Sequence, residues 1–123
     1  MLYATKENEQ RLRAAVAQTK VFLLDMDGTV YIENELIGDM KNTLSAIRRS
    51  GRRVVYFTNN SSKTVKEYEE KLSRLGIFGE EDAVYTSGVA AAEYLNEFYA
   101  GKKVYLVGTD GLRGEFEEAG IAL

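Results

Sequence analysis

Two carboxylates, Asp25 and Asp27, stand one residue apart directly after the apolar run of residues 21–24. A continuous apolar run predicts a central parallel strand that is buried on both faces, and ligands bind at the carboxyl ends of such strands. Two carboxylates held this close repel each other, so the pair makes physical sense where a cation binds. The natural candidate is a hard divalent cation with oxygen ligands, most simply Mg²⁺. The alternative is that this Asp-x-Asp-Gly segment serves only as a turn.

A second polar group, at residues 58–62, follows the next apolar strand in the same way. If the two strands are neighbours, Thr58 and Asn59 lie with the two carboxylates at one edge of the sheet. The backbone N–H groups at the start of the following helix favour an anion, so the sequence predicts a phosphate site with a metal. Asp25 is suited to attack phosphorus and form an aspartyl-phosphate. Asp27 is suited to protonate the leaving oxygen and then to deprotonate the attacking water.

Hydrophobic spacing and turn residues predict an alternation of strands and helices along the chain. The predicted elements are a helix at 5–18, a strand at 20–25, a hairpin-like flap at 28–38, a helix between Asp39 and Gly51, a strand at 53–57, a helix at 63–75 capped by Ser61 or Ser62, a strand at 83–85, a helix capped by Ser87 and ending at Gly101, a strand at 103–107 and a short helix before Gly120. This order predicts an α/β fold, a Rossmann-like parallel sheet with right-handed crossovers and helices on both faces.

Two features of this order bear on the site. The flap at 28–38 directly follows the two carboxylates and is placed to cover them. The chain ends in the apolar residues 121–123, which look like the start of a further strand. We therefore expect the chain to be cut within a fold.

Composition excludes several classes of function. The chain of 123 residues has a net charge of −3 and contains neither His nor Cys. This excludes a Ser-His-Asp triad, a Cys-His pair, thiolate chemistry and a His-bearing zinc site within the chain. The acidic balance offers no basic surface to a nucleic-acid backbone. No apolar run approaches the ~18–20 residues that cross a bilayer, and residues 1–20 lack a signal-peptide core. We therefore expect a cytoplasmic protein with no nucleic-acid or membrane partner.

The motif Asp25-Met26-Asp27-Gly28-Thr29-Val30 resembles the D-x-D-G-T-[LV] first motif of the haloacid dehalogenase (HAD) superfamily of phosphohydrolases. The segment Thr58-Asn59-Asn60, which follows an apolar strand, is similar to the second motif of that superfamily. A longer pattern, which adds Tyr31, residues 36–38 and residues 85–88, resembles the p-nitrophenylphosphatase-like branch. The first motif is specific, the second is weak alone, and the two together after strand ends form a strong signal over nearly the whole chain.

This resemblance implies a role for each matching residue. It implies that Asp25 is the nucleophile and a Mg²⁺ ligand. It implies that Asp27 is the acid/base and holds Mg²⁺ through its backbone carbonyl. The phosphate-binding residues that it implies are Met26, Asp27, Thr58 and Asn59. The substrate that it implies is a small phosphorylated metabolite, such as a sugar phosphate, phosphoglycolate, a nucleotide or pyridoxal phosphate.

The resemblance also implies the domain organisation. Residues 1–100 are expected to form the N-terminal part of an HAD core, and residues 101–123 the beginning of a truncated α/β cap, which would place the strand at 103–107 outside the core sheet. Two further motifs of the superfamily, a Lys that balances charge on the phosphoryl group and an acidic pair that completes the Mg²⁺ site, match nothing in this sequence. We therefore expect the N-terminal part of a longer enzyme, with weak Mg²⁺ binding and little turnover by this chain alone.

Other interpretations stay open. The main alternative is a non-catalytic phosphate-binding or phospho-acceptor module, such as a receiver-like signalling domain. Such a domain needs its acceptor Asp on a different strand from the acidic pair, whereas the second and third strands end in Thr58 and in Thr86-Ser87. A catalytically inactive interaction protein is a third interpretation. An incomplete sheet would expose apolar edges and favour association, so a homo-oligomer is also considered.

Overall fold

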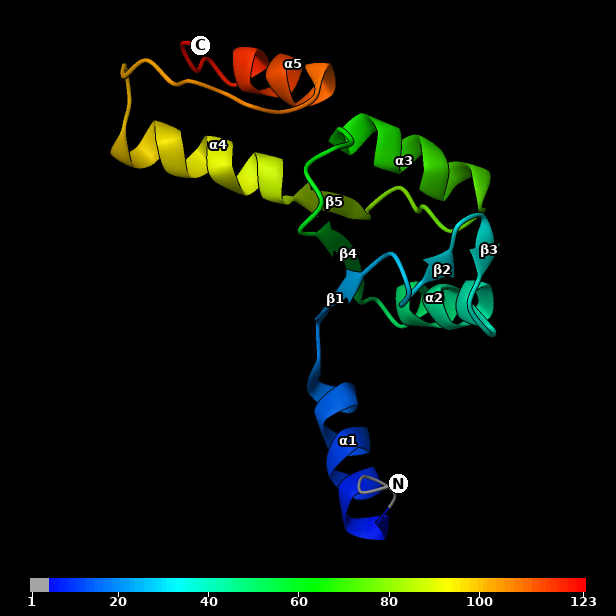
Figure 1. Cartoon of the computed structure of the whole chain (residues 1–123). Coiled ribbons are helices and arrows are strands. Elements are labelled where there is room, and N and C mark those ends of the chain that lie inside the picture. Colours follow the sequence, from blue (N-terminus) through cyan, green and yellow to red (C-terminus); the bar gives the residue numbers. More distant parts are fainter. Residues whose placement is uncertain (1–4) are drawn as a thin grey trace.

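Three parallel strands form the central sheet of the molecule (Figure 1). The computed structural model describes residues 5–123. The strands, hydrogen-bonded in the order β1-β4-β5, are β1 (Val21–Asp25), β4 (Arg53–Thr58) and β5 (Ala83–Thr86). The first two predicted strands are therefore neighbours, and the predicted α/β class with a parallel sheet flanked by helices is confirmed.

Two helices, α2 (Met40–Arg49) and α3 (Val65–Arg74), pack against one face of this sheet. Every second residue of the strands points its side chain toward these helices. The apolar faces of the helices bury those side chains. The core so formed includes Leu44, Val54, Tyr56, Tyr68, Leu72 and Val84. α2 begins after Asp39 and is followed by Gly51 at φ +78°, as the turn residues predict. This packing is what the i, i+3 and i+4 spacing of apolar residues dictates.

The prediction that the first strand is buried on both faces is wrong in this chain. β1 lies at the edge of the described sheet, and Leu23 is 64% exposed. Its neighbours on the same face, Val21 and Phe57, are 45% and 43% exposed. The reason is that α2 and α3 both pack on the opposite face. An apolar run therefore shows only that a strand can be buried on both faces. Whether each face is buried depends on the elements that pack against it.

Two predicted helix caps are also wrong by one to three residues. The side chain of Thr64, and neither Ser61 nor Ser62, caps α3 and forms a reciprocal capping box with Glu67. The side chain of Thr86, and not Ser87, caps α4 (Ser87–Phe98) by accepting a hydrogen bond from the N–H of Val89. A hydroxyl can cap only where the first helical turn begins, and that point is set by packing.

The predicted strand at 103–107 does not form. Lys103 makes a single parallel bridge to Ala122, and the segment lies outside the three-stranded sheet. Its inward side chains pack with α4 and α5 (Asp110–Glu118), in a second core that contains Ala92, Leu112, Phe116 and Ile121 with Val104 and Leu106 against it. The outward Tyr105 and Val107 are 94% and 84% exposed. The alternation of the segment is real, but no second strand lies beside it in the described residues.

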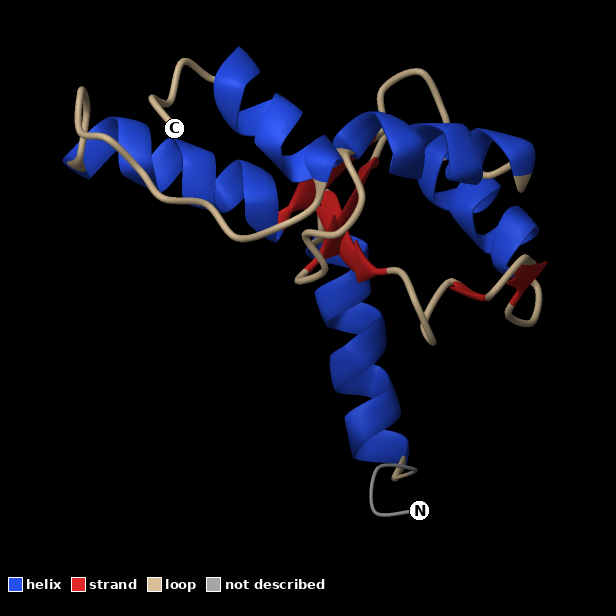
Figure 2. Ribbon diagram, turned by 45° about the horizontal axis from the view of Figure 1, so that its top comes forward, coloured by secondary structure: helices blue, strands red, loops and turns tan. Residues whose placement is uncertain are grey.

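The predicted first helix is present as α1 (Lys6–Gln18). It buries none of its residues and projects from the amino end of β1, away from the other helices (Figures 1 and 2). No helix among residues 5–123 is long and apolar enough to cross a bilayer.

Candidate active site

The ends of β1 and β4 meet as the sequence predicts. Asp25, the last residue of β1, pairs in register with Phe57, and Thr58 follows as the last residue of β4. Asp25 is exposed, whereas Thr58 is buried and only 6% exposed. A carboxylate and a hydroxyl thus stand at the carboxyl edge of two adjacent strands, the position where open parallel sheets bind ligands.

A tight turn follows Asp25 and directs the next carboxylate. The carbonyl of the buried Met26 accepts hydrogen bonds from the N–H groups of Thr29 and Val30, at 3.1 and 2.9 Å. Gly28 adopts φ +80°, a conformation that glycine reaches at little cost. The hydroxyl of Thr29 donates a 3.1 Å hydrogen bond to Oδ2 of Asp25. The turn leaves Asp27 exposed and restrains the Asp25 carboxylate.

The predicted flap is a short hairpin directly after this turn. Its strands are β2 (Tyr31–Ile32) and β3 (Glu35–Leu36), which pair antiparallel. Glu33, in the two-residue connection, adopts φ +53°. The first strand is joined to the carboxylate turn because the N–H of Gly28 donates to the carbonyl of Tyr31 at 2.9 Å. The position of the flap is therefore linked to that of Asp27.

The loop after β4 holds its polar groups in an ordered chain of hydrogen bonds. The hydroxyl oxygen of Thr58 accepts from the N–H of Asn60 at 3.1 Å, and the side chain of Asn60 accepts from the N–H of Ser62 at 2.8 Å. The carbonyl of Asn59 accepts a 2.9 Å bond from the hydroxyl of Ser87. Because the Thr58 oxygen is an acceptor here, its own proton is available to a further acceptor. Thr58 and Asn59 thus lie where the sequence places them.

Thr109, the N-cap residue of α5, and Glu115 within that helix support this loop and the start of α3, and the sequence did not indicate either of them. The hydroxyl of Thr109 donates to the carbonyl of Ser62 at 3.2 Å. The carboxylate of Glu115 accepts a 2.7 Å hydrogen bond from the N–H of Val65. These contacts join positions about fifty residues apart, and no periodicity within the sequence indicates them.

Two tyrosines and a lysine near the carboxylates were also missed. Tyr31 and Tyr68 are buried, and the ammonium of Lys71 lies 4.0 Å from the centroid of the Tyr31 ring. Burial raises the pKa of Tyr31 to about 12, and the nearby charge of Asp27 adds to this effect. Burial lowers the pKa of Lys71, and the charge of Lys63 lowers it further. Tyr68 has the helical spacing of a core residue and Lys71 that of an outer-face charge, and this spacing does not indicate that both lie close to Asp27.

The oxygen donors at this edge fit Mg²⁺. Within residues 5–123 no group of three or more His, Cys, Asp or Glu side chains comes together to hold a metal. Mg²⁺, however, is usually held by one or two carboxylates, with water and phosphate oxygens completing its shell. Asp25, together with the backbone carbonyl of Asp27, offers such a partial set of hard oxygen donors.

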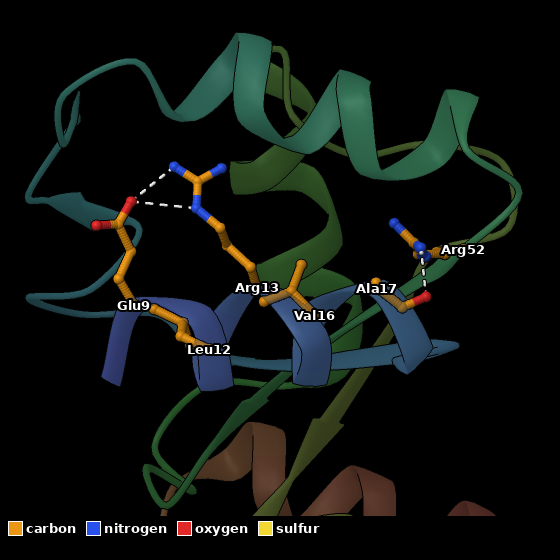
Figure 3. Close-up of a pocket in the computed structure, with 6 residues that line it drawn as sticks. All are labelled: Glu9, Leu12, Arg13, Val16, Ala17 and Arg52. Atoms are coloured by element: carbon orange, nitrogen blue, oxygen red, sulfur yellow. Dashed lines mark hydrogen bonds and ion pairs between the residues drawn. The ribbon is translucent and has the colours of Figure 1, made fainter. Parts of the chain in front are cut away.

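A surface recess lies at the opposite end of the strands. It is lined by residues of α1 and by Arg52, which precedes β4, and Figure 3 shows these side chains. There Arg52 donates a 2.9 Å hydrogen bond to the carbonyl of Ala17, and Arg13 pairs with Glu9. The recess lies at the amino ends of the strands, whereas Asp25 lies at a carboxyl end, so the two sites are separate. The charged groups of the recess already have partners.

Comparison with known proteins decides the family. Residues 22–122 match the haloacid dehalogenase-like hydrolases. The chain belongs to this family. The matched range begins within β1 and contains both strand ends of the candidate site, so the resemblance drawn from the two motifs is confirmed.

Named relatives of this HAD-like chain are phosphatases. Phosphoglycolate phosphatase 1A, chloroplastic, of Arabidopsis thaliana is 37% identical over 116 residues, which cover 93% of this chain and 31% of the relative. An acid sugar phosphatase of Staphylococcus aureus is 36% identical over 106 residues, 86% of this chain and 41% of the relative. The crystal structure of a 4-nitrophenylphosphatase from Thermotoga maritima superposes with a TM-score of 0.80 and 35% identity, covering 85% of this chain and 40% of that one. The chain spans well under half the length of these three HAD proteins.

Proposed function

We propose that this chain carries the nucleophile, the acid/base and part of the phosphate-binding groups of a Mg²⁺-dependent HAD phosphomonoesterase. The observation that carries this proposal is the register of β1 and β4, which sets Asp25 beside the end of the strand that bears Thr58. In this proposal Asp25 is the nucleophile and Asp27 the acid/base. The phosphate oxygens are bound by groups of Met26, Asp27, Thr58 and Asn59.

The proposed reaction has two steps. A carboxylate oxygen of Asp25 bonds to phosphorus while the bond from phosphorus to the ester oxygen breaks, and Asp27 gives its proton to the departing alcohol. Asp27 then takes a proton from water, the water oxygen bonds to phosphorus and the bond to Asp25 breaks. The products are an alcohol and inorganic phosphate, and both carboxyl groups return to their starting protonation states.

The surrounding hydrogen bonds support these roles. The Thr29 hydroxyl holds Oδ2 of Asp25, which orients the carboxylate at the end of β1. The Thr58 oxygen accepts from Asn60, so the Thr58 hydroxyl can donate its proton to a phosphate oxygen. A bound Mg²⁺, held by the Asp25 carboxylate and the Asp27 carbonyl, would neutralise negative charge on the nucleophile and on the phosphoryl group.

The substrate class that we propose is a small phosphorylated metabolite. The relatives named above include a phosphoglycolate phosphatase and an acid sugar phosphatase, which support a small phosphate monoester. The chain covers 31% and 41% of these two relatives. We therefore assign the choice of substrate within this class to the parts of such proteins that this chain does not cover.

Two measurements on the purified protein test this function. The first is Mg²⁺-dependent release of phosphate from p-nitrophenyl phosphate, with Asp25→Asn and the exposed Asp110→Asn as a matched pair. The second is fluorine NMR with beryllofluoride, which mimics a phosphoryl group on a carboxylate and needs no turnover. Asp25→Asn should lower turnover by about a thousandfold and abolish the bound fluorine signal, because it removes the nucleophile. Asp110→Asn should leave both unchanged.

The two readouts separate the candidate functions. A bound fluorine signal that depends on Asp25, with turnover, supports the phosphatase. The same signal without turnover fits a phospho-acceptor module and also the N-terminal part of a phosphatase. Little turnover is expected of that part, because no group of three or more His, Cys, Asp or Glu side chains comes together within residues 5–123. Turnover or a bound fluorine signal that survives Asp25→Asn contradicts the proposal.

A further inference from the structure

Two buried tyrosine hydroxyls near the candidate site have no hydrogen-bond partner. Tyr31 is 0% exposed and Tyr68 is 1% exposed. Neither hydroxyl oxygen makes a hydrogen bond of normal geometry within residues 5–123. Tyr56, a third buried tyrosine of the same core, donates to the carbonyl of Ile77 at 2.5 Å. The two unpartnered hydroxyls are therefore a local exception within one core.

The two hydroxyls share the surroundings of Asp27 and Thr58. Tyr31 forms a backbone bridge with Asp27, and its carbonyl is bonded to the turn that carries Asp27. The charges of Asp27 and Tyr68 both help to raise the pKa of Tyr31. Burial raises the pKa of Tyr68, and hydrogen bonding toward the Thr58 side chain lowers it in part, so these two hydroxyls lie near hydrogen-bonding range. The phenols thus lie near the groups proposed to bind and protonate a phosphate ester.

Lysine side chains stand over both rings. The ammonium of Lys71 is 4.0 Å from the Tyr31 ring centroid, and that of Lys63 is 5.9 Å from the Tyr68 ring centroid. The Lys71 contact holds the Tyr31 ring against α3. The Lys63 contact holds the Tyr68 ring against the loop that precedes α3. They depend on the ring faces and not on the hydroxyl groups. A phenylalanine in either position would keep them.

Burying a hydroxyl without a partner is unfavourable, and a phenyl ring would fill the same space without that cost. Hydroxyls placed in this way do not stabilise the ligand-free fold, and they become favourable only in a state in which they gain a partner. The polar groups next to them are Asp27 and Thr58, whose own partners change when a phosphate ester binds and a proton moves.

We infer that Tyr31 and Tyr68 are positioning residues, whose hydroxyls donate hydrogen bonds to the Asp27 carboxylate and the Thr58 hydroxyl in the phosphate-bound state. The inference rests on the proposed function of these two residues. It predicts that the tyrosine hydroxyls contribute to turnover and phosphate affinity and contribute nothing to the stability of the ligand-free fold.

The test compares Tyr31→Phe and Tyr68→Phe with Tyr56→Phe, which removes a hydroxyl of the same core that is bonded to the carbonyl of Ile77. Thermal unfolding, affinity for inorganic phosphate in Mg²⁺, and kcat and KM for p-nitrophenyl phosphate are measured for each. Tyr31→Phe and Tyr68→Phe should keep or raise Tm, lower kcat by about tenfold and weaken the affinity for inorganic phosphate. Tyr56→Phe should lower Tm and leave kcat unchanged.

The opposite pattern overturns the inference. If Tyr31→Phe and Tyr68→Phe lower Tm as Tyr56→Phe does and leave kcat and phosphate affinity unchanged, the hydroxyls are ordinary structural groups. Asp25→Asn, measured in parallel, separates this result from failure of the proposed function. Loss of turnover in Asp25→Asn with full turnover in both phenylalanine variants refutes the positioning role alone. Full turnover in Asp25→Asn, or no phosphate affinity in the unmodified protein, refutes the proposed function and the positioning role together.

Discussion

The carboxylate of Glu115, in α5, accepts a 2.7 Å hydrogen bond from the backbone N–H of Val65, the first residue of α3. This bond joins two helices that are fifty residues apart, and it satisfies one of the N–H groups that a helix start leaves free. It also places negative charge at the positive end of α3. The residues after α4 therefore help to hold the helix that follows the proposed phosphate loop.

Glu115→Ala should lower the free energy of unfolding by about 1 kcal/mol, because it leaves the Val65 N–H without its partner. Urea unfolding followed by circular dichroism measures the change. Glu118→Ala, an exposed position on the same helix, is the control and should change stability little. Equal stability of the two variants would show that the bond across α5 and α3 adds nothing.

Asp82→Ala should be the most destabilising of these substitutions, by about 3 kcal/mol, because it breaks a buried ion pair. The Asp82 side chain is 2% exposed and accepts from Arg48 at 2.5 Å and from the N–H of Gly79 at 2.8 Å. Guanidinium chloride unfolding measures the loss. The exposed neighbour Glu81→Ala serves as control. A loss below about 1 kcal/mol, the range of surface pairs, would contradict the burial argument.

Thr64→Ala should cost about 1 kcal/mol, because Thr64 accepts the N–H of Glu67 in the capping box of α3. Thr64→Ser keeps the hydroxyl and should retain most of the stability. Ser62→Ala removes one of the two hydroxyls that the sequence predicts as the cap and should have little effect. Thermal unfolding of the three variants ranks them. A larger loss for Ser62→Ala than for Thr64→Ala would place the start of the helix earlier than observed.

Alkaline pH should destabilise the protein through its buried phenols. Burial raises the pKa of Tyr31 and of Tyr56 to about 12. The native state then keeps its phenolic protons where the unfolded chain, with a pKa near 10, has lost them. The stability that the buried phenols contribute is fully present below about pH 10. It is lost as the pH rises toward 12, by on the order of 1–2 kcal/mol for each tyrosine.

Urea unfolding between about pH 8 and 12 measures this slope, and Tyr56→Phe should make it shallower. Tyr105→Phe, at a side chain that is 94% exposed, should leave the slope unchanged. An identical slope in the unmodified protein and in Tyr56→Phe would contradict the assignment of the slope to buried phenols.

The proposed site was predictable because its signals are local. An apolar run that ends in Asp25 and Asp27, and another that ends in Thr58 and Asn59, indicates strand ends wherever the rest of the chain lies. The parallel pairing of the two strands follows from the helix between them, since a crossover of that length brings consecutive strands side by side. The family match spans these same residues.

Tertiary structure alone decided the rest, for a physical reason in each case. The exposure of Leu23 depends on which elements cover a face, and periodicity does not record this. The cap of α3 is Thr64 because packing sets where the first turn begins. Tyr68 has the spacing of an ordinary core residue because its ring is apolar. Its hydroxyl group does not alter the hydrophobic pattern, so the pattern does not show what surrounds that hydroxyl. The bond between Glu115 and Val65 exists only because two distant helices meet. A sequence indicates the secondary structure that each segment favours by itself. The surroundings of a side chain are formed by segments far along the chain.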